Sequence, residues 1–190
     1  MTRTLAGRLL FKRWSSLVFV DESVGSPTPL DWPQGYRYRW YSSARELPDP
    51  ERTALSRQGA SGFLADLAAV DGLYVVWHGA DVASYGAVMM RSPQRSVLGL
   101  PDTACLIGLC ETVPEHRLRG LYSRALMQTV QVLRGAGHEA IFVEVREENT
   151  ASIGGIVKAG FRHWRRVDAQ IWLGCLVRRS GRWHRLVRGD

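Results

Sequence analysis

A basic turn between an apolar run and an amphipathic segment is the part of the chain best suited to hold an anion. The turn covers residues 113–120 and carries Arg117, Arg119 and a single glycine, Gly120. The first amides of a helix have no partner inside the helix, and the helix dipole adds partial positive charge there. A diphosphate accepts from several such amides at once, and a glycine lets the backbone approach it closely. Taken alone, such a turn is more often a solvated helix cap than a cofactor site.

A second polar segment follows further along the chain. It runs from Asn149 to Ser152 and is followed by Lys158 to Phe161. Asparagine is a strong helix N-cap, and a glycine commonly ends a helix. By itself this segment predicts a short capped helix that stops at Gly160, with Phe161 in the core.

The basic turn and the second polar segment each follow an apolar run, and an amphipathic segment lies between them. These three stretches would position both segments. Residues 104–112 and 140–145 are strongly apolar, as buried strands are. Residues 121–135 carry apolar side chains at helical spacing and end at a glycine. Further strands are predicted at 36–40, 73–78, 82–90, 161–166 and 170–178, and a helical segment near 62–70. A meander followed by alternating helices and strands predicts an α/β fold of the mixed α+β kind, with helices covering one sheet.

The first residues of the chain form a separate feature. Apolar side chains recur at roughly helical spacing from Leu5 to Leu17, with basic residues between them. This pattern predicts a terminal helix or helix–strand element, and the alternative is a basic amphipathic helix on a membrane surface. Residues 25–34 hold three prolines and predict a loop. We therefore expect residues 1–34 to be an N-terminal extension packed on a domain of residues 35–190.

Composition narrows the function classes without choosing one. The 190 residues carry a formal charge of +7, and Lys12 and Lys158 are the only lysines. An excess of arginine attracts nucleic acid, anionic lipid or a polyanionic small molecule, and arginine-rich usage is typical of a GC-rich bacterial gene. The three cysteines have no CxxC spacing, which favours buried thiols in a reducing cytoplasm over a zinc site or disulfides. No stretch approaches the length of a membrane span, and we expect a cytoplasmic protein.

Together, the two polar segments resemble the signatures of the GNAT superfamily of acyl-CoA N-acyltransferases. The family pattern R/Q-x-x-G-x-G/A is matched by Arg117-Leu118-Arg119-Gly120-Leu121-Tyr122, and the pattern N-x-x-A/S…K-x-G-F is matched by Asn149, Ser152, Lys158, Gly160 and Phe161. The resemblance covers residues 104–161. It implies the GNAT fold, a mostly antiparallel central sheet whose fourth and fifth strands are parallel and splayed, with flanking helices.

The resemblance also implies a co-substrate and the residues that bind it. Acetyl-CoA, or another acyl-CoA, would lie between the two splayed strands, and its pantetheine arm would pair with the backbone of Glu111, Thr112 and Val113. An amide there would stabilise the oxyanion of a tetrahedral intermediate. The diphosphate would be held by the amides of Arg117, Leu118, Arg119, Gly120, Leu121, Tyr122 and Ser123, and Asn149 and Ser152 would complete the cofactor site.

Two positions depart from the family pattern. Tyr122 stands where the family has glycine or alanine, so its ring has to point away from the phosphates. Ile156 stands where many members have a tyrosine that is proposed to protonate the leaving thiolate. The usual general acid is therefore absent, and solvent or another residue has to take its role.

The general base is predicted from position and chemistry. Glu111 ends the strand that faces the cleft and is the first candidate, although a solvated strand-end carboxylate fits it equally well. His116 is second, because its ordinary pKa suits the task. Glu144 and Glu147 are weaker candidates. No histidine has metal-ligand spacing with a partner, so we expect no metal.

The sequence thus predicts an N-acyltransferase, most simply an acetyltransferase in which the primary amine of a small molecule attacks the thioester directly. That small molecule could also carry an anionic group. A transferase for longer acyl groups or acyl-carrier protein shares every motif. A non-catalytic acyl-CoA-binding module is the second class. Nucleic-acid binding has only charge in its favour and is not expected. A homodimer is left open.

Overall fold

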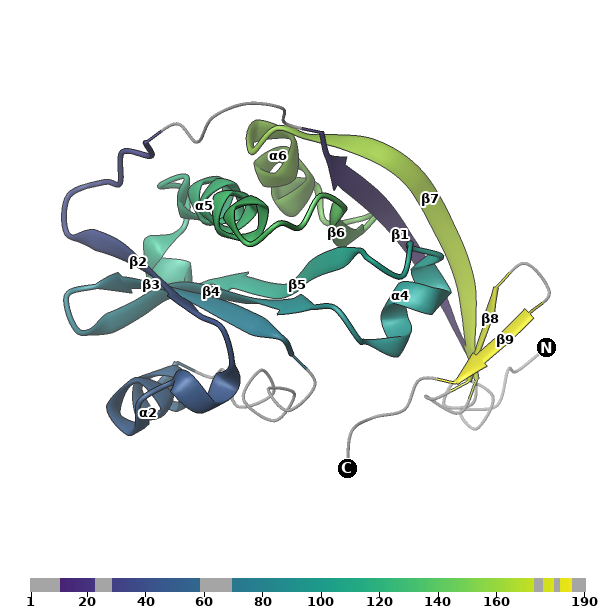
Figure 1. Ribbon diagram of the computed structural model, residues 1–190, viewed down its shortest axis with the longest axis horizontal. Coiled ribbons are helices and arrows are strands. Elements are labelled where there is room, and N and C mark those ends of the chain that lie inside the picture. The colour runs from purple at the N-terminus through teal and green to yellow at the C-terminus, as the bar shows by residue number, and fades with distance from the viewer. Residues whose placement is uncertain (1–10, 23–28, 59–69, 173–175, 180–181, 186–190) are drawn as a thin grey trace, which may run out of the picture.

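The computed structural model describes residues 11–22, 29–58, 70–172, 176–179 and 182–185. Its described strands form one nine-stranded sheet in the order β2-β3-β4-β5-β6-β1-β7-β8-β9 (Figure 1). All neighbouring strands are antiparallel except β5 and β6. The strands are β1 (Phe11–Asp21), β2 (Tyr36–Tyr41), β3 (Gly72–His78), β4 (Asp81–Met89), β5 (Cys105–Thr112), β6 (Ile141–Arg146), β7 (Phe161–Trp172), β8 (Leu176–Arg179) and β9 (Arg182–Arg185).

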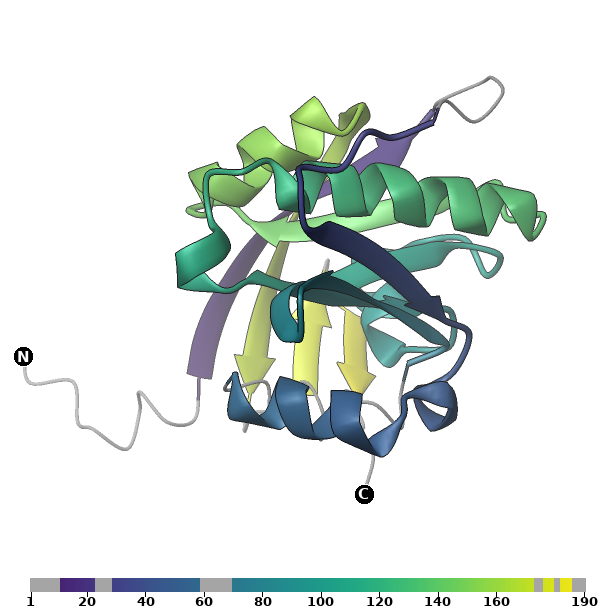
Figure 2. The ribbon, with the colours of Figure 1, turned by 90° about the vertical axis from the view of Figure 1, so that its left-hand side faces the viewer.

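Helices cover both faces of this sheet (Figures 1 and 2). On one face, α5 (Leu121–Gly135) and α6 (Thr150–Lys158) bury Leu126 and Ile156 against β6. On the other, α2 (Asp49–Arg57) and α4 (Pro93–Leu98) bury leucines against β5 and its neighbours. Two 3-10 turns complete the described helical elements, η1 (Ala44–Glu46) and η3 (Pro114–His116). The expected mixed sheet with flanking helices is confirmed.

Helix α5 has the limits that its sequence predicts. Its buried stripe comprises Leu121, Ser123, Ala125, Leu126, Thr129, Val130 and Leu133, the spacing of one face of a 3.6-residue period. In its last turn Arg134 forms an ion pair with Asp21 of β1 at 2.9 Å, and the Asp21 side chain is only 2% exposed. A cation in the last turn also complements the helix dipole. The pair therefore ties the end of α5 to the sheet.

Strand β1 is the strand part of the expected terminal helix or helix–strand element, and it excludes a helix over residues 11–21. Residues 11–21 are extended and lie inside the sheet, antiparallel to both β6 and β7. Two alternating series of side chains are buried there, Ser16 and Val18 on one face and Phe19 on the other. Within β1 the helical spacing depended on Trp14 and Leu17 alone. Both faces of a central strand are covered, so its apolar residues do not alternate cleanly. Residues 1–10 lie outside the described part of the chain.

Other expectations need smaller corrections. The parallel pair is β5 and β6 rather than the fourth and fifth strands, because β1 precedes the meander, but the residues are those predicted. The predicted strand at 161–166 and the start of the one at 170–178 form a single strand, β7, in which Asp168 alternates with buried Val167 and Ala169. Residues 176–178 of the second prediction belong to β8. Helix α4 was not predicted. The helical segment expected near 62–70 falls almost wholly outside the described residues. Within the described part, no helix is both long and apolar enough to cross a membrane.

The parallel pairing between β5 and β6 is short. It extends from Cys105 and Ile141 to Ile107 and Val143, after which the strands diverge. β5 carries a bulge at this point, because Leu109 has φ +53° and the register with β4 shifts opposite Gly86. A Cβ on Gly86 would lie 2.6 Å from the ring of Tyr74 and 2.7 Å from Cys110 Sγ. Only a glycine fits there, and the bulge re-aims the end of β5 away from β6.

A stability measurement checks that β1 belongs to the core. Phe19→Ala should lower the free energy of unfolding by about 3–5 kcal/mol, because a buried ring is replaced by a cavity. Val157→Ala removes methyl groups from a side chain that is 56% exposed and should change it by less than about 0.5 kcal/mol. Urea unfolding of both variants measures the difference. Equal stabilities would contradict an internal β1.

Candidate active site

The loop before α5 presents unpaired amides at one end of the diverging strands. In the described structure, the amides of Leu121, Tyr122 and Ser123 have no backbone acceptor, and Gly120 provides no side-chain cap. Leu118 and Gly120 both have positive φ, +63° and +69°, so the loop curls back on itself. A non-glycine residue in this conformation is uncommon, and such strain gathers at functional sites. The arrangement matches an anion site at a helix N-terminus.

Cations surround this loop. Arg117 is exposed, and its Nε donates to the Thr112 carbonyl at 3.0 Å. Arg124 donates to the Asp31 carbonyl at 2.9 Å and to the carbonyls of Arg119 and Gly120 at 3.4 Å, so it holds the loop in place. A Cβ built on Gly120 would lie 3.9 Å from Lys158 Nζ, which brings the end of α6 to the same point. The summed charge favours a polyanion.

A cavity of about 650 Å³ lies between this loop and α6, and we call it the α5–α6 cavity. It unites almost all of the residues that the sequence assigned to the cofactor or to catalysis. Its lining includes Glu111, Thr112, His116, Arg117, Leu118, Gly120, Leu121, Tyr122, Ser123, Asn149 and Ser152, together with Cys110, Ala151, Gly154, Gly155 and Lys158. The Asn149 side chain accepts from the Ser152 amide at 3.1 Å, which confirms the predicted N-cap of α6.

Two predicted cofactor residues lie outside this lining. The Val113 amide donates to the Ala83 carbonyl at 2.9 Å, and its side chain is buried, so Val113 is not a free donor for a pantetheine arm. Arg119 is exposed and does not line the cavity, although its carbonyl is bound by Arg124. The sequence did not single out Arg124 or Cys110, because neither belongs to a family signature.

A second cavity, of about 580 Å³, opens between the diverging strands, and we call it the β5–β6 cavity. Its lining comprises Trp14, Gln94, Val97, Ile107, Gly108, Leu109, Cys110, Tyr122, Val143, Glu144, Val145, Arg146, Asn149 and Ser152. It therefore reaches the sheet face that α4 covers. Cys110, Tyr122, Asn149 and Ser152 line both cavities, so the two meet at these residues.

Glu111, the first predicted base, lies in the α5–α6 cavity at the end of β5. Its side chain is exposed and accepts a hydrogen bond from the Tyr85 hydroxyl at 2.7 Å. Burial, together with the hydrogen bond to Glu111, raises the pKa of Tyr85, so this hydroxyl stays a donor. The Glu111 carboxylate is thus oriented and reachable from solvent.

His116, the second predicted base, belongs to a cluster of rings. Its Nδ1 lies 2.9 Å from the Tyr36 hydroxyl, and its ring centroid lies 5.4 Å from that of His78. Burial lowers the pKa of His116, and the charges of His78 and Arg119 lower it further. The imidazole is therefore neutral at physiological pH, but the ring is turned toward β2 and not toward the β5–β6 cavity.

Glu144 is the carboxylate that the structure brings into the β5–β6 cavity. It stands on β6, is half-buried, and accepts hydrogen bonds from the Ser16 hydroxyl and from Gln94 Nε2, the latter at 2.9 Å. Burial raises the pKa of Glu144, and the two hydrogen bonds and Arg146 only partly offset that effect. Perturbed carboxylates in clefts are functional-site candidates. A glutamate inside an apolar strand was the sequence signal for this residue.

Among the described residues, no group of three or more His, Cys, Asp or Glu side chains is placed to hold a metal ion.

The raised pKa of Glu144 has a testable effect on stability. Because the folded protein holds the Glu144 proton more tightly than the unfolded chain, the charged carboxylate costs stability at neutral pH. Glu144→Gln should therefore be more stable than the wild type at neutral pH. The gain should shrink as pH falls through the raised folded pKa toward the ordinary value of 4.5. Urea unfolding at several pH values measures it, and a gain that does not vary with pH would contradict the buried charge.

Comparisons with known proteins agree with this architecture. No protein-family model matches the sequence, and no curated protein matches it either. Among solved structures, the fold is similar to a GNAT-family acetyltransferase of Novosphingobium aromaticivorans (TM-score 0.56, 18% identity, 83% of this chain and 63% of that chain). It is also similar to one from Colwellia psychrerythraea (0.59, 14%, 84% and 56%) and to a GCN5-related N-acetyltransferase of Sphaerobacter thermophilus (0.57, 14%, 89% and 55%). The chain spans about three fifths of these proteins. The expected fold is confirmed: this chain has the fold of the GNAT acetyltransferases.

Proposed function

We propose that the protein is an acyl-CoA-dependent N-acyltransferase that moves an acetyl group from acetyl-CoA to the primary amine of a small molecule by direct attack. The observation that carries this proposal is the meeting of two cavities between β5 and β6. One is rimmed by free amides and cations, and the other holds a half-buried carboxylate. A donor and an acceptor held in these cavities would face each other, which lowers the entropic part of the barrier.

The α5–α6 cavity fits the donor. The free amides of Leu121, Tyr122 and Ser123, with Arg117 and Lys158 beside them, would hold the diphosphate of CoA. The stretch of β5 beyond Ile107 does not pair with β6, although it still pairs with β4, so its peptide groups on the β6 side are left for a pantetheine arm. The thioester supplies an activated carbonyl, and a β5 amide would stabilise the oxyanion that forms on attack.

The β5–β6 cavity fits an amine acceptor. An amine is protonated at neutral pH, and Glu144 offers it a half-buried carboxylate that has two hydrogen-bond donors to orient it. The raised pKa of Glu144 makes it a better proton acceptor than an exposed glutamate. We therefore propose Glu144 as the base, with Glu111 and His116 as the alternatives on the other side of β5. Arg146 lines the same cavity and supports an acceptor that also carries an anionic group.

Donor binding tests the first half of the proposal. Titration calorimetry should show saturable binding of acetyl-CoA, and Arg117→Glu or Gly120→Val should each weaken it about 10- to 100-fold, the effect of losing one charge-assisted contact or the close approach of the loop. Arg57→Glu, on α2 across the sheet, is the matched charge reversal and should leave affinity unchanged. Absence of saturable binding for every CoA thioester, or unaltered affinity in both loop variants, would refute the donor site.

An assay of free CoA release in the presence of a panel of amines tests the second half of the proposal, which is acyl transfer to an acceptor. Glu144→Gln should lower kcat by about 10²-fold or more, the usual contribution of a general base, and Glu111→Gln should lower it less. The reverse order would assign the base to Glu111. Binding of acetyl-CoA without thiol release for any amine would favour a non-catalytic acyl-CoA-binding module, and release only from longer thioesters would favour a longer-chain transferase.

A further inference from the structure

The position at which many members of the family carry the proton-donating tyrosine is buried in the core of this protein. Ile156 on α6 is 0% exposed and packs in the core with Leu126 and Val143. Neither cavity includes it in its lining. No side chain at position 156 would therefore reach the reacting atoms without rearrangement of the core.

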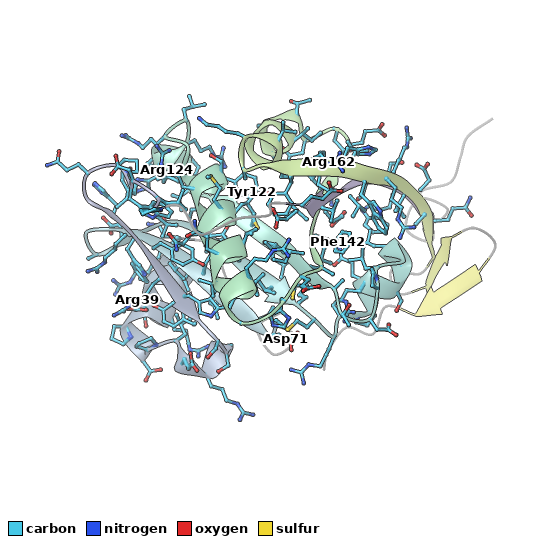
Figure 3. All side chains as sticks on the ribbon, turned by 45° about the horizontal axis from the view of Figure 1, so that its top comes forward. Arg39, Asp71, Tyr122, Arg124, Phe142 and Arg162 are labelled. Carbon is cyan, nitrogen blue, oxygen red and sulfur yellow. The ribbon has the colours of Figure 1, made fainter. Side chains whose placement is uncertain are left out.

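Tyr122 lies where the two cavities meet. It projects from the first turn of α5, and its ring packs on α6 at Gly155, where a Cβ would lie 2.6 Å from Tyr122 Cδ1 (Figure 3). The ring therefore turns toward α6 and the gap between β5 and β6. Its hydroxyl forms no hydrogen bond to another described residue. Tyr122 lines both cavities, so its side chain is accessible where they meet.

The other residues common to both cavities are less suited to give a proton. The Cys110 thiol lies over Gly86 of β4 and donates to the Gly108 carbonyl at 3.4 Å, so it is directed back toward the sheet. Asn149 uses its side-chain oxygen to cap α6. A serine hydroxyl such as that of Ser152 is a weaker acid than a phenol.

We propose that the Tyr122 hydroxyl is the proton donor to the leaving thiolate, in place of the tyrosine that the family carries at the position of Ile156. This inference rests on the proposed acyl transfer. The donor comes from the first turn of α5, at the position where the family pattern has a small residue, and Gly155 provides the space for its ring.

The proton balance of the step is complete without another reactant. When the tetrahedral adduct collapses, the carbonyl double bond re-forms, the C–S bond breaks, and its electron pair stays on sulfur. The Tyr122 proton moves to sulfur and gives the free thiol. The acceptor ammonium loses two protons in becoming an amide. One of them restores the phenol, and the other leaves to solvent through Glu144.

The surroundings keep the hydroxyl protonated until that moment. Burial raises the pKa of Tyr122, and the nearby Cys110 and Glu144 raise it further. The phenol is therefore protonated at neutral pH and can donate a hydrogen bond to the sulfur. A donor aimed at the sulfur stabilises charge only as it develops, which is the requirement for catalysis.

The experiment compares two donors that differ in one atom. One is acetyl-CoA, and the other is its selenoester analogue, whose selenolate leaves without protonation. Tyr122→Phe keeps the ring on Gly155 and removes only the hydroxyl. Its kcat should fall about 10²-fold with the thioester and less than about 3-fold with the selenoester, while the Kd of either donor is unchanged.

A matched control removes a different buried hydroxyl. Tyr38 lies on β2, its hydroxyl is 3.1 Å from Thr129 Oγ1, and it lines neither cavity. Tyr38→Phe should leave kcat unchanged with both donors. Equal losses with the two donors in Tyr122→Phe, or an unchanged kcat with the thioester, would overturn the assignment alone. Absence of thiol release by the wild type would instead overturn the proposed function, and the assignment with it.

Discussion

The site depends on the early end of pairing between two parallel strands. Beyond Ile107 and Val143 the peptide groups of β5 and β6 no longer satisfy each other, and such groups are costly inside a protein unless something else pairs with them. The bulge at Leu109 fixes the divergence, and Gly86 makes room for it. The sheet thus holds a gap open at its centre, with helices on both faces to stabilise it.

The two sides of this gap differ in charge. On the α5 side, free amides, Arg117 and Lys158 make the surroundings positive. On the α4 side, the half-buried carboxylate of Glu144 is held by neutral donors from β1 and α4, and Arg146 lines the same cavity. This arrangement would favour an anionic donor in the α5–α6 cavity and the amine of an acceptor beside Glu144. β1 contributes directly to this side, because Ser16 donates a hydrogen bond to Glu144 and Trp14 lines the cavity.

Short-range sequence patterns made part of this site predictable. Helix α5, the N-cap at Asn149 and the strands on either side depend on short-range signals, namely apolar period, capping and glycine ends, and these were right. The position of β1 was not predictable, because a strand covered on both faces has no alternation to separate it from a helix. For a similar reason the sequence named Glu144 only as a weaker candidate for the base. Its partners Ser16 and Gln94 come from elements that local pattern did not place.

The contact between Tyr122 and Gly155 explains why α6 has a glycine in its interior, where glycine lowers the stability of a helix. Glycine inside a helix costs about 1 kcal/mol relative to alanine, and α6 carries two in succession, Gly154 and Gly155. At Gly155 a methyl group would meet the Tyr122 ring, so a large residue at the start of α5 requires a small one here. Gly154 has no such neighbour within 4 Å, but it lines the α5–α6 cavity. The ring of Tyr122 and the glycine beneath it are thus a single feature, in which a bulky side chain at a usually small position closes the contact between the two helices and lines both cavities.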